Sequence, residues 1–111
     1  MNNISLVGRL TRDPEMREAG GKFVANFTLA VDREFKRDEA DFVRIVVWER
    51  QAENCEKYIG KGSLVGVVGR LQTRNYEDKE GNKRTMTEVV ARNVEFLDKR
   101  KQEEENDEFP F

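Results

Sequence analysis

Hydrophobic and polar residues alternate with a period of two along much of the chain. The alternation is clearest in residues 23–33 (FVANFTLAVDR), where apolar side chains occupy every second position over most of the segment. Because successive side chains of a strand point to opposite faces, this pattern predicts a half-buried strand. The same reasoning predicts further strands at residues 4–10, 41–48, 63–76 and 85–97.

One segment has the spacing of a helix instead. In residues 50–59 (RQAENCEKYI) the apolar side chains fall on one helical face. They are Ala52, Cys55, Tyr58 and Ile59. Gly60 and Gly62 follow, and they suit the end of a helix and the turn after it. The lone cysteine, Cys55, is therefore predicted to be a small core residue rather than a reactive thiol.

Turn signals separate these elements and define the predicted fold. The signals are Asp13-Pro14, Gly20-Gly21, a charged loop at 33–40 and a polar hairpin tip at 77–84. The predicted order is three strands, a short helix and a two-stranded hairpin. Five strands with one helix between the third and fourth predict an all-β OB-fold barrel. A small β-sandwich with a surface helix would give a similar pattern.

Two of the predicted strands carry cations and aromatic rings on the face opposite their core-facing residues. In residues 41–48 the core-facing set is Val43, Ile45 and Val47, and the other set is Phe42, Arg44, Val46 and Trp48. In residues 63–76 the core-facing set is Val65, Val67, Gly69 and Leu71, and the other set is Arg70, Gln72, Arg74 and Tyr76. A purely solvated face would not need large rings, and a core would not tolerate unpaired arginines.

More bases and rings are interleaved in the predicted loops. The charged loop contains Arg33, Phe35, Lys36 and Arg37, and the hairpin tip contains Lys79, Lys83 and Arg84. This mixture suits a single-stranded nucleic acid, because exposed bases stack on rings while Lys and Arg follow the phosphates. A duplex keeps its bases stacked inside, so single strands are expected to bind better. The alternative is that Phe42 and Trp48 are core residues and the arginines form surface salt bridges.

Composition narrows the classes of function. The chain of 111 residues has 20 basic and 22 acidic residues, a net charge of −2 and no histidine. One domain with tails is expected at this length. Without histidine, a Ser-His-Asp set or a CxxC pair, we expect no catalytic site, no metal and no cofactor. The run at 60–63 lacks the spacing of a phosphate-binding loop and is interpreted as a turn.

Cysteine content and hydropathy indicate the compartment. A single cysteine excludes an internal disulfide. No segment is long and apolar enough to span a bilayer, and the start of the chain does not resemble a signal peptide. A reduced, cytoplasmic protein is therefore expected.

The last ten residues (QEEENDEFPF) differ from the rest of the chain. They contain five acidic and no basic residues, so the remainder has a net charge near +3. A run of like charges buries no apolar area, so a disordered tail is expected. Two terminal phenylalanines beside acidic residues indicate a peptide that docks on a partner, and a solvated charged end is the alternative. A tethered anionic tail would also compete with a polyanion for the basic face.

Taken together, these stretches resemble the bacterial and phage single-stranded DNA-binding protein (SSB) family. The similar segments are ISLVGRLTRDPEMR, VANFTLAVDREF, residues 41–84, TEVVARNVEFL and the acidic terminus ending in Pro-Phe. The resemblance covers essentially the whole chain. It implies a homotetramer of OB barrels that binds single-stranded DNA without sequence preference. It also implies a role in DNA replication, recombination and repair at the nucleoid.

The resemblance implies roles for individual residues. Phe35, Phe42, Trp48 and Tyr76 would stack on bases. The cations expected along the DNA path are Arg33, Lys36, Arg37, Arg44, Arg70, Arg74, Lys83 and Arg84. The residues expected to dock replication, recombination and repair proteins are Asp107, Glu108, Phe109, Pro110 and Phe111.

Departures from the family pattern leave the role of the tail open. Residues 1–98 would form the barrel and residues 99–111 the tail, without the Gly-, Pro- or Gln-rich linker of long family members. The short tether limits the reach of the tip and favours a specialised paralogue, for DNA uptake or phage replication. An OB-fold RNA-binding or primosome-type module is a competing interpretation, and so is an adaptor that acts through the tail alone.

Overall fold

The computed structural model describes residues 1–98, which form six strands and one helix. The elements are β1 (Ile4–Leu10), β2 (Glu15–Ala19), β3 (Lys22–Arg33), β4 (Lys36–Trp48), α1 (Glu49–Tyr58), β5 (Leu64–Glu77) and β6 (Lys83–Phe96). The predicted tail at 99–111, including the predicted docking tip at 107–111, lies outside the described residues.

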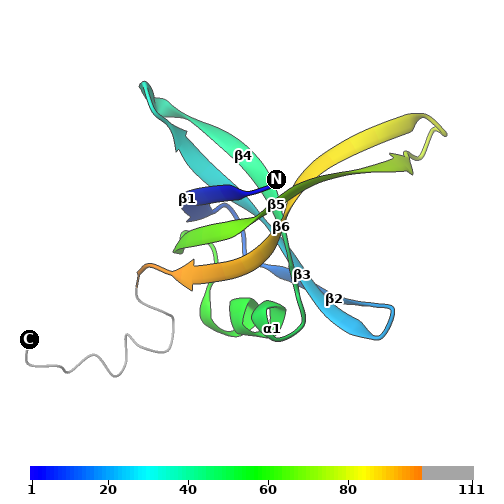
Figure 1. Ribbon diagram of the computed structural model, residues 1–111, viewed down its shortest axis with the longest axis horizontal. Coiled ribbons are helices and arrows are strands. Elements are labelled where there is room, and N and C mark those ends of the chain that lie inside the picture. The colour runs from blue at the N-terminus through cyan, green and yellow to red at the C-terminus, as the bar shows by residue number, and fades with distance from the viewer. Residues whose placement is uncertain (99–111) are drawn as a thin grey trace, which may run out of the picture.

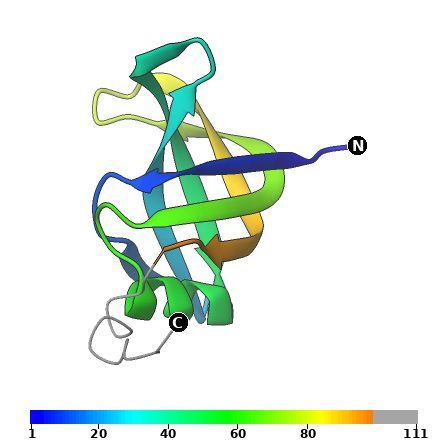
Figure 2. The ribbon, with the colours of Figure 1, turned by 90° about the vertical axis from the view of Figure 1, so that its left-hand side faces the viewer.

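Five of the strands form a closed barrel, shown from two sides in Figures 1 and 2. The strand order is β1-β5-β6-β4-β3-β2, and β1 also pairs with β3, which closes the ring. Every pairing is antiparallel except the one between β4 and β6. β2 pairs with β3 and extends that edge outside the ring. The predicted five-stranded OB-fold barrel with one helix is therefore confirmed.

Two glycines allow the strands to approach closely around the ring. A Cβ atom at Gly8 would overlap the carbonyl oxygen of Ala30 on β3. A Cβ atom at Gly69 would overlap the carbonyl oxygen of Val90 on β6, where the register of the β5–β6 pair shifts. The barrel closes where β1 meets β3, over only two residue pairs. A side chain at Gly8, next to these pairs, would not fit.

The core combines the inward residues of the alternating strands with the buried face of α1. Its buried members are Leu10, Ala25, Phe27, Leu29, Ile45, Val47, Ala52, Cys55, Ile59, Val65, Val67 and Val89. Burial raises the pKa of the Cys55 thiol to about 12. The thiol is therefore protonated and unreactive at neutral pH, in agreement with the predicted core role.

Two long hairpins extend beyond the barrel on the side away from α1 (Figure 1). The β3–β4 arm comprises residues 31–41 and the β5–β6 arm comprises residues 75–85. In Figure 1 the two arms diverge from each other as separate projections from the barrel. The predicted site residues therefore divide between the barrel and these arms.

One strand was missed and two local predictions are wrong. Residues 15–19, for which the sequence predicted no element, form β2, because β3 supplies hydrogen-bond partners to a mostly polar segment. The loop predicted at 33–40 shrinks to a two-residue turn, because β4 begins at Lys36. Leu71, predicted to face the core, is exposed because β5 runs past the end of the barrel core at that point.

Candidate nucleic-acid interface

Two adjoining hollows form a groove on the outer face of the barrel, lined by β2 to β6 and by the segment before β2. One part has a volume of about 220 Å³ and is lined by Arg17, Val24, Asn26, Arg44, Val46, Trp48, Gln72, Arg74 and Glu88. The adjoining part has a volume of about 570 Å³ and is lined by Thr11, Arg12, Asp13, Glu15, Asn26, Phe27, Thr28, Phe42 and Arg44. The two parts share Asn26 and Arg44 and are called the barrel groove below.

Two aromatic side chains stand at the ends of the barrel groove on the same strand. Trp48 is 39% exposed and Phe42 is 69% exposed. They are six residues apart on one face of β4, which corresponds to roughly 20 Å of extended strand. Val46 between them is buried on the outer face, and the Arg44 side chain lies at the centre. Both rings are therefore exposed rather than core residues, and their stacking on bases stays a prediction.

A buried carboxylate connects the arginines of the barrel groove. Glu88 on β6 is only 2% exposed, and it is the one buried charged residue among the side chains that the structure describes. Its Oε2 accepts a hydrogen bond from Nε of Arg44 at 3.2 Å. Its Oε1 accepts hydrogen bonds from Nε of Arg74 at 2.9 Å and from the side-chain amide of Gln72 at 3.2 Å.

The environment of Glu88 keeps this carboxylate charged. Burial opposes ionisation, but the hydrogen bonds from Gln72, Arg74 and Arg44 outweigh it and lower the pKa of Glu88 below its usual value. At neutral pH the centre of the groove therefore holds the charged carboxylate of Glu88 bonded to the guanidinium groups of Arg44 and Arg74. The sequence interpretation did not single out Glu88, although an acidic residue beside the apolar pair Val89 and Val90 is an unusual feature of a strand.

The β3–β4 arm presents a ring surrounded by ion pairs. Phe35 at its turn is 93% exposed. Arg33 bonds Glu39 at 3.2 Å and Asp41 at 2.9 Å, and Lys36 lies 3.7 Å from Glu39. The alternative interpretation was that the cations form surface salt bridges. Arg33 and Lys36 do form them. Arg37 lies on the same arm, near the start of β4.

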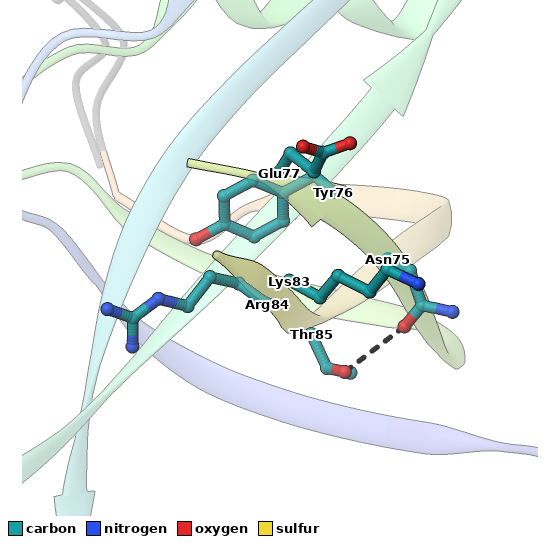
Figure 3. Close-up of a pocket in the computed structure, with 6 residues that line it drawn as sticks. All are labelled: Asn75, Tyr76, Glu77, Lys83, Arg84 and Thr85. Atoms are coloured by element: carbon teal, nitrogen blue, oxygen red, sulfur yellow. Dashed lines mark hydrogen bonds between the residues drawn. The ribbon is translucent and has the colours of Figure 1, made fainter. Parts of the chain in front are cut away.

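The β5–β6 arm forms a second hollow, of about 500 Å³, drawn in Figure 3. It is lined by Asn75, Tyr76, Glu77, Lys83, Arg84 and Thr85. Figure 3 shows the Tyr76 ring beside the stems of Lys83 and Arg84, whose charged ends point in opposite directions. Arg84 donates through Nε to Asp78 at 3.0 Å.

Asp78 fixes the turn of the β5–β6 arm. Its carboxylate accepts hydrogen bonds from the backbone N–H groups of Asn82 and Glu80 as well as from Arg84. These bonds, led by that of the Asn82 N–H, lower the pKa of Asp78. The turn is thus held by a charged aspartate at its surface.

The structure brings only part of the predicted site together. Trp48, Phe42, Arg44 and Arg74 line the barrel groove. Arg70 lies on the same face of β5, is exposed, and has no ion pair among residues 1–98. The remaining predicted residues lie on the two arms. Sequence alternation located the faces, but it did not indicate that the arms separate these groups.

Residues 1–98 show neither a metal site nor a membrane-spanning helix. Among residues 1–98, no cluster of His, Cys, Asp and Glu side chains has the arrangement of a metal site. Within these residues α1 is far too short and polar to cross a membrane.

A closed OB barrel with exposed rings between fixed cations defines a class of proteins that bind polyanionic strands with unstacked bases. Residues 1–97 match the model of the "Single-strand binding protein family", and the chain belongs to that family. The prediction of this family is therefore confirmed, and as a member the chain is a binding protein rather than an enzyme.

Several bacterial proteins are similar to the chain. "Single-stranded DNA-binding protein 1" of Staphylococcus aureus is 57% identical over 103 residues, which cover 88% of this chain and 66% of that protein. "Single-stranded DNA-binding protein 3" of Clostridium acetobutylicum is 53% identical and is covered over 72% of its length. A relative from Halalkalibacterium halodurans is 54% identical and is covered over 62%. The chain thus spans about two thirds of the length of these relatives.

Proposed function

We propose that this protein binds single-stranded DNA with little sequence preference and protects it. The observation that carries the proposal is the outer face of β4, where Phe42 and Trp48 flank Arg44 in one continuous groove. The names of the relatives, each a single-stranded DNA-binding protein, support the same function. Single strands fit this face because their bases are free to stack on the two rings.

Binding is expected to combine stacking with electrostatic attraction. Each stacked base contributes about 1–3 kcal/mol, and Lys or Arg contacts to phosphates release counterions. The predicted phosphate contacts are Arg33, Lys36, Arg37, Arg44, Arg70, Arg74, Lys83 and Arg84. Ring stacking and phosphate contacts do not depend on the identity of the base, so sequence preference is expected to be weak.

Trp48 provides the direct test, because it is the only tryptophan of the chain. Titration with oligo(dT) is expected to quench its fluorescence strongly, and the affinity is expected to fall as salt rises. A matched oligo(U) and a DNA duplex serve as controls and should bind more weakly. Tighter binding of the RNA would favour an RNA-binding module. Absence of binding to oligo(dT) by fluorescence and by anisotropy would refute the proposal.

We further propose that the protein works as a homotetramer. Val7, Val68 and Leu97 are exposed on the outside of β1, β5 and the end of β6, and an apolar surface of this kind favours association between copies. Sedimentation equilibrium measures the assembly, and Val7→Asp is expected to shift it toward smaller species. A monomer at micromolar concentration would contradict this part of the proposal.

The predicted tail at 99–111 completes the proposed function. We propose that its tip, Asp107 to Phe111, recruits proteins of DNA replication, recombination and repair, and that the protein acts on nucleoid DNA in the cytoplasm. The acidic residues would also compete with DNA for the basic groove. Removal of residues 102–111 is expected to tighten oligo(dT) binding most at low salt. The same affinity with and without the tail at every salt concentration would exclude that competition.

A further inference from the structure

The arginines of the barrel groove are held from beneath. The Glu88 carboxylate is 2% exposed, whereas the side chains of Arg44 and Arg74 are 32% and 44% exposed. The acid therefore lies below the surface of the groove and the guanidinium groups lie above it. A buried carboxylate needs partners of this kind, because an unpaired charge in the interior is strongly unfavourable.

Both arginines use the same atom to contact Glu88. Arg44 and Arg74 each donate through Nε, the nitrogen nearest the aliphatic stem. A guanidinium group has five N–H donors, so this contact leaves the four terminal donors of each arginine. One terminal nitrogen of Arg74 contacts the sulfur of Met86 at 3.5 Å, which is a weak interaction. The remaining terminal donors have no other partner among residues 1–98.

We propose that Glu88 is a positioning residue for single-strand binding. Its carboxylate fixes the stems of Arg44 and Arg74 so that their terminal nitrogens are presented to phosphate groups next to Trp48. Fixing the two side chains before DNA arrives reduces the conformational entropy that binding would otherwise lose. This inference rests on the proposed function, because it assigns the site at which Glu88 acts.

Electrostatics alone predicts the opposite effect for this residue. A negative charge inside a phosphate-binding groove repels the ligand, so its removal should tighten binding. A positioning role predicts that removal weakens binding, because Arg44 and Arg74 lose their common anchor. The sign of one measurement therefore separates the two explanations.

The test compares Glu88→Gln with Glu15→Gln in the full-length protein, with fluorescein-labelled oligo(dT) as the probe. The glutamine keeps the shape of the Glu88 side chain, but its NH2 group cannot accept a hydrogen bond. One of the two arginines therefore loses its partner. Oligo(dT) binding is expected to weaken about fivefold. Glu15 lies exposed on the rim of the same groove and holds neither arginine, so Glu15→Gln removes the same charge and is expected to tighten binding.

A second comparison tests whether Glu88 affects DNA binding through Arg44 and Arg74. In a background of Arg44→Met and Arg74→Met, Glu88→Gln is expected to have no further effect on binding. The Nε–H signals of Arg44 and Arg74 in NMR spectra are expected to be protected from exchange in the unaltered protein. In Glu88→Gln at least one of them should lose this protection.

Should Glu88→Gln fail to fold, Arg44→Lys provides the test. Lysine keeps the positive charge, but its one ammonium group cannot bond Glu88 through one nitrogen and present two others to a phosphate. It is expected to weaken binding about fivefold, against less than twofold for Arg70→Lys, which has no acidic anchor among residues 1–98. Equal losses would overturn the proposal.

The outcomes separate the two levels of inference. If Glu88→Gln tightens binding as Glu15→Gln does, or weakens it equally without the two arginines, the positioning role is wrong and the proposed function stands. If the unaltered protein does not bind oligo(dT), the proposed function and the positioning role both fail.

Discussion

The barrel groove and the β3–β4 arm hold their cations in different ways. In the groove, Arg44 and Arg74 bond a carboxylate that is buried beneath them. On the β3–β4 arm, Arg33 and Lys36 bond carboxylates that are themselves well exposed. Exposed pairs of this kind contribute about 0–1 kcal/mol and exchange readily with water or another anion. The difference indicates a preformed central site with an adaptable β3–β4 arm beside it.

This difference matters for a ligand without a fixed shape. A single strand has many conformations, so a rigid central site selects one short stretch while the β3–β4 arm adjusts to the rest. Phe35 is nearly fully exposed at its turn, whereas Trp48 is packed at the edge of the barrel groove. The barrel and the arms are therefore expected to differ in rigidity and in the energy of stacking. They are also expected to differ in whether removal of an acidic residue weakens or tightens DNA binding.

The largest effect is expected from glycine substitutions that compare the barrel ring with an arm. Gly8→Ala places a Cβ against the carbonyl oxygen of Ala30, and it is expected to lower the free energy of unfolding by about 3 kcal/mol. Gly81, at the turn of the β5–β6 arm, has φ 83° and open space around it. Gly81→Ala is expected to lower the same quantity by only about 1 kcal/mol. Urea unfolding measures both, and equal losses would contradict a rigid barrel with tolerant arms.

Stacking is expected to give the next largest effect. Trp48→Ala should weaken oligo(dT) binding by about 2 kcal/mol, because the indole is already held beside the groove arginines. Phe35→Ala should weaken it by about 1 kcal/mol, since the Phe35 side chain is 93% exposed and loses rotamer freedom when it stacks on a base. Anisotropy of a labelled oligo(dT) measures both variants without the intrinsic fluorescence. A larger loss for Phe35→Ala would reverse the assignment of the central site.

The sequence alone predicted the barrel well, because the hydrophobic pattern of each strand and of the helix is visible within a short segment of the chain. Residues 23–33 alternate apolar and polar side chains, and residues 50–59 change to helical spacing, so strands and helix follow from short windows. β2 was missed because Glu15, Arg17 and Glu18 give it little apolar signal, and its pairing depends on β3. Its prediction would have required knowledge of the neighbouring strand.

The centre of the site was predictable only in part. The alternation in residues 41–48 placed Phe42, Arg44 and Trp48 on one face without any structure. Glu88 acquires its role only when β4, β5 and β6 meet, since Arg44 lies 44 positions away in the chain. Leu71 was placed in the core because alternation does not indicate where a strand leaves the barrel. Pattern therefore identifies faces, and tertiary contacts identify partners.

Acid should weaken the barrel groove through Glu88. The pKa of this carboxylate is lowered in the folded protein, so its contribution to stability is present above the ordinary glutamate pKa and is lost as the pH falls through the lowered value. The difference in unfolding free energy between the unaltered protein and Glu88→Gln should therefore be constant above about pH 5 and shrink in stronger acid. Urea unfolding across this range measures it, with Glu15→Gln as the control. A difference that stays constant down to about pH 2, well below the ordinary glutamate pKa, would exclude an ionised Glu88 as the source.

The smallest effect is expected from Glu39→Gln on the β3–β4 arm, and its sign is the sharpest contrast with the barrel groove. Glu39 pairs with both Arg33 and Lys36 at the surface, so its removal frees Lys36, leaves Arg33 paired with Asp41, and deletes a charge that repels phosphate. Because no buried anchor is lost, oligo(dT) binding should tighten about twofold at low salt, and this gain should vanish as the salt rises. Weaker binding for Glu39→Gln would show that the arm also depends on positioning by its acids, and the distinction between a preformed groove and adaptable arms would then fail.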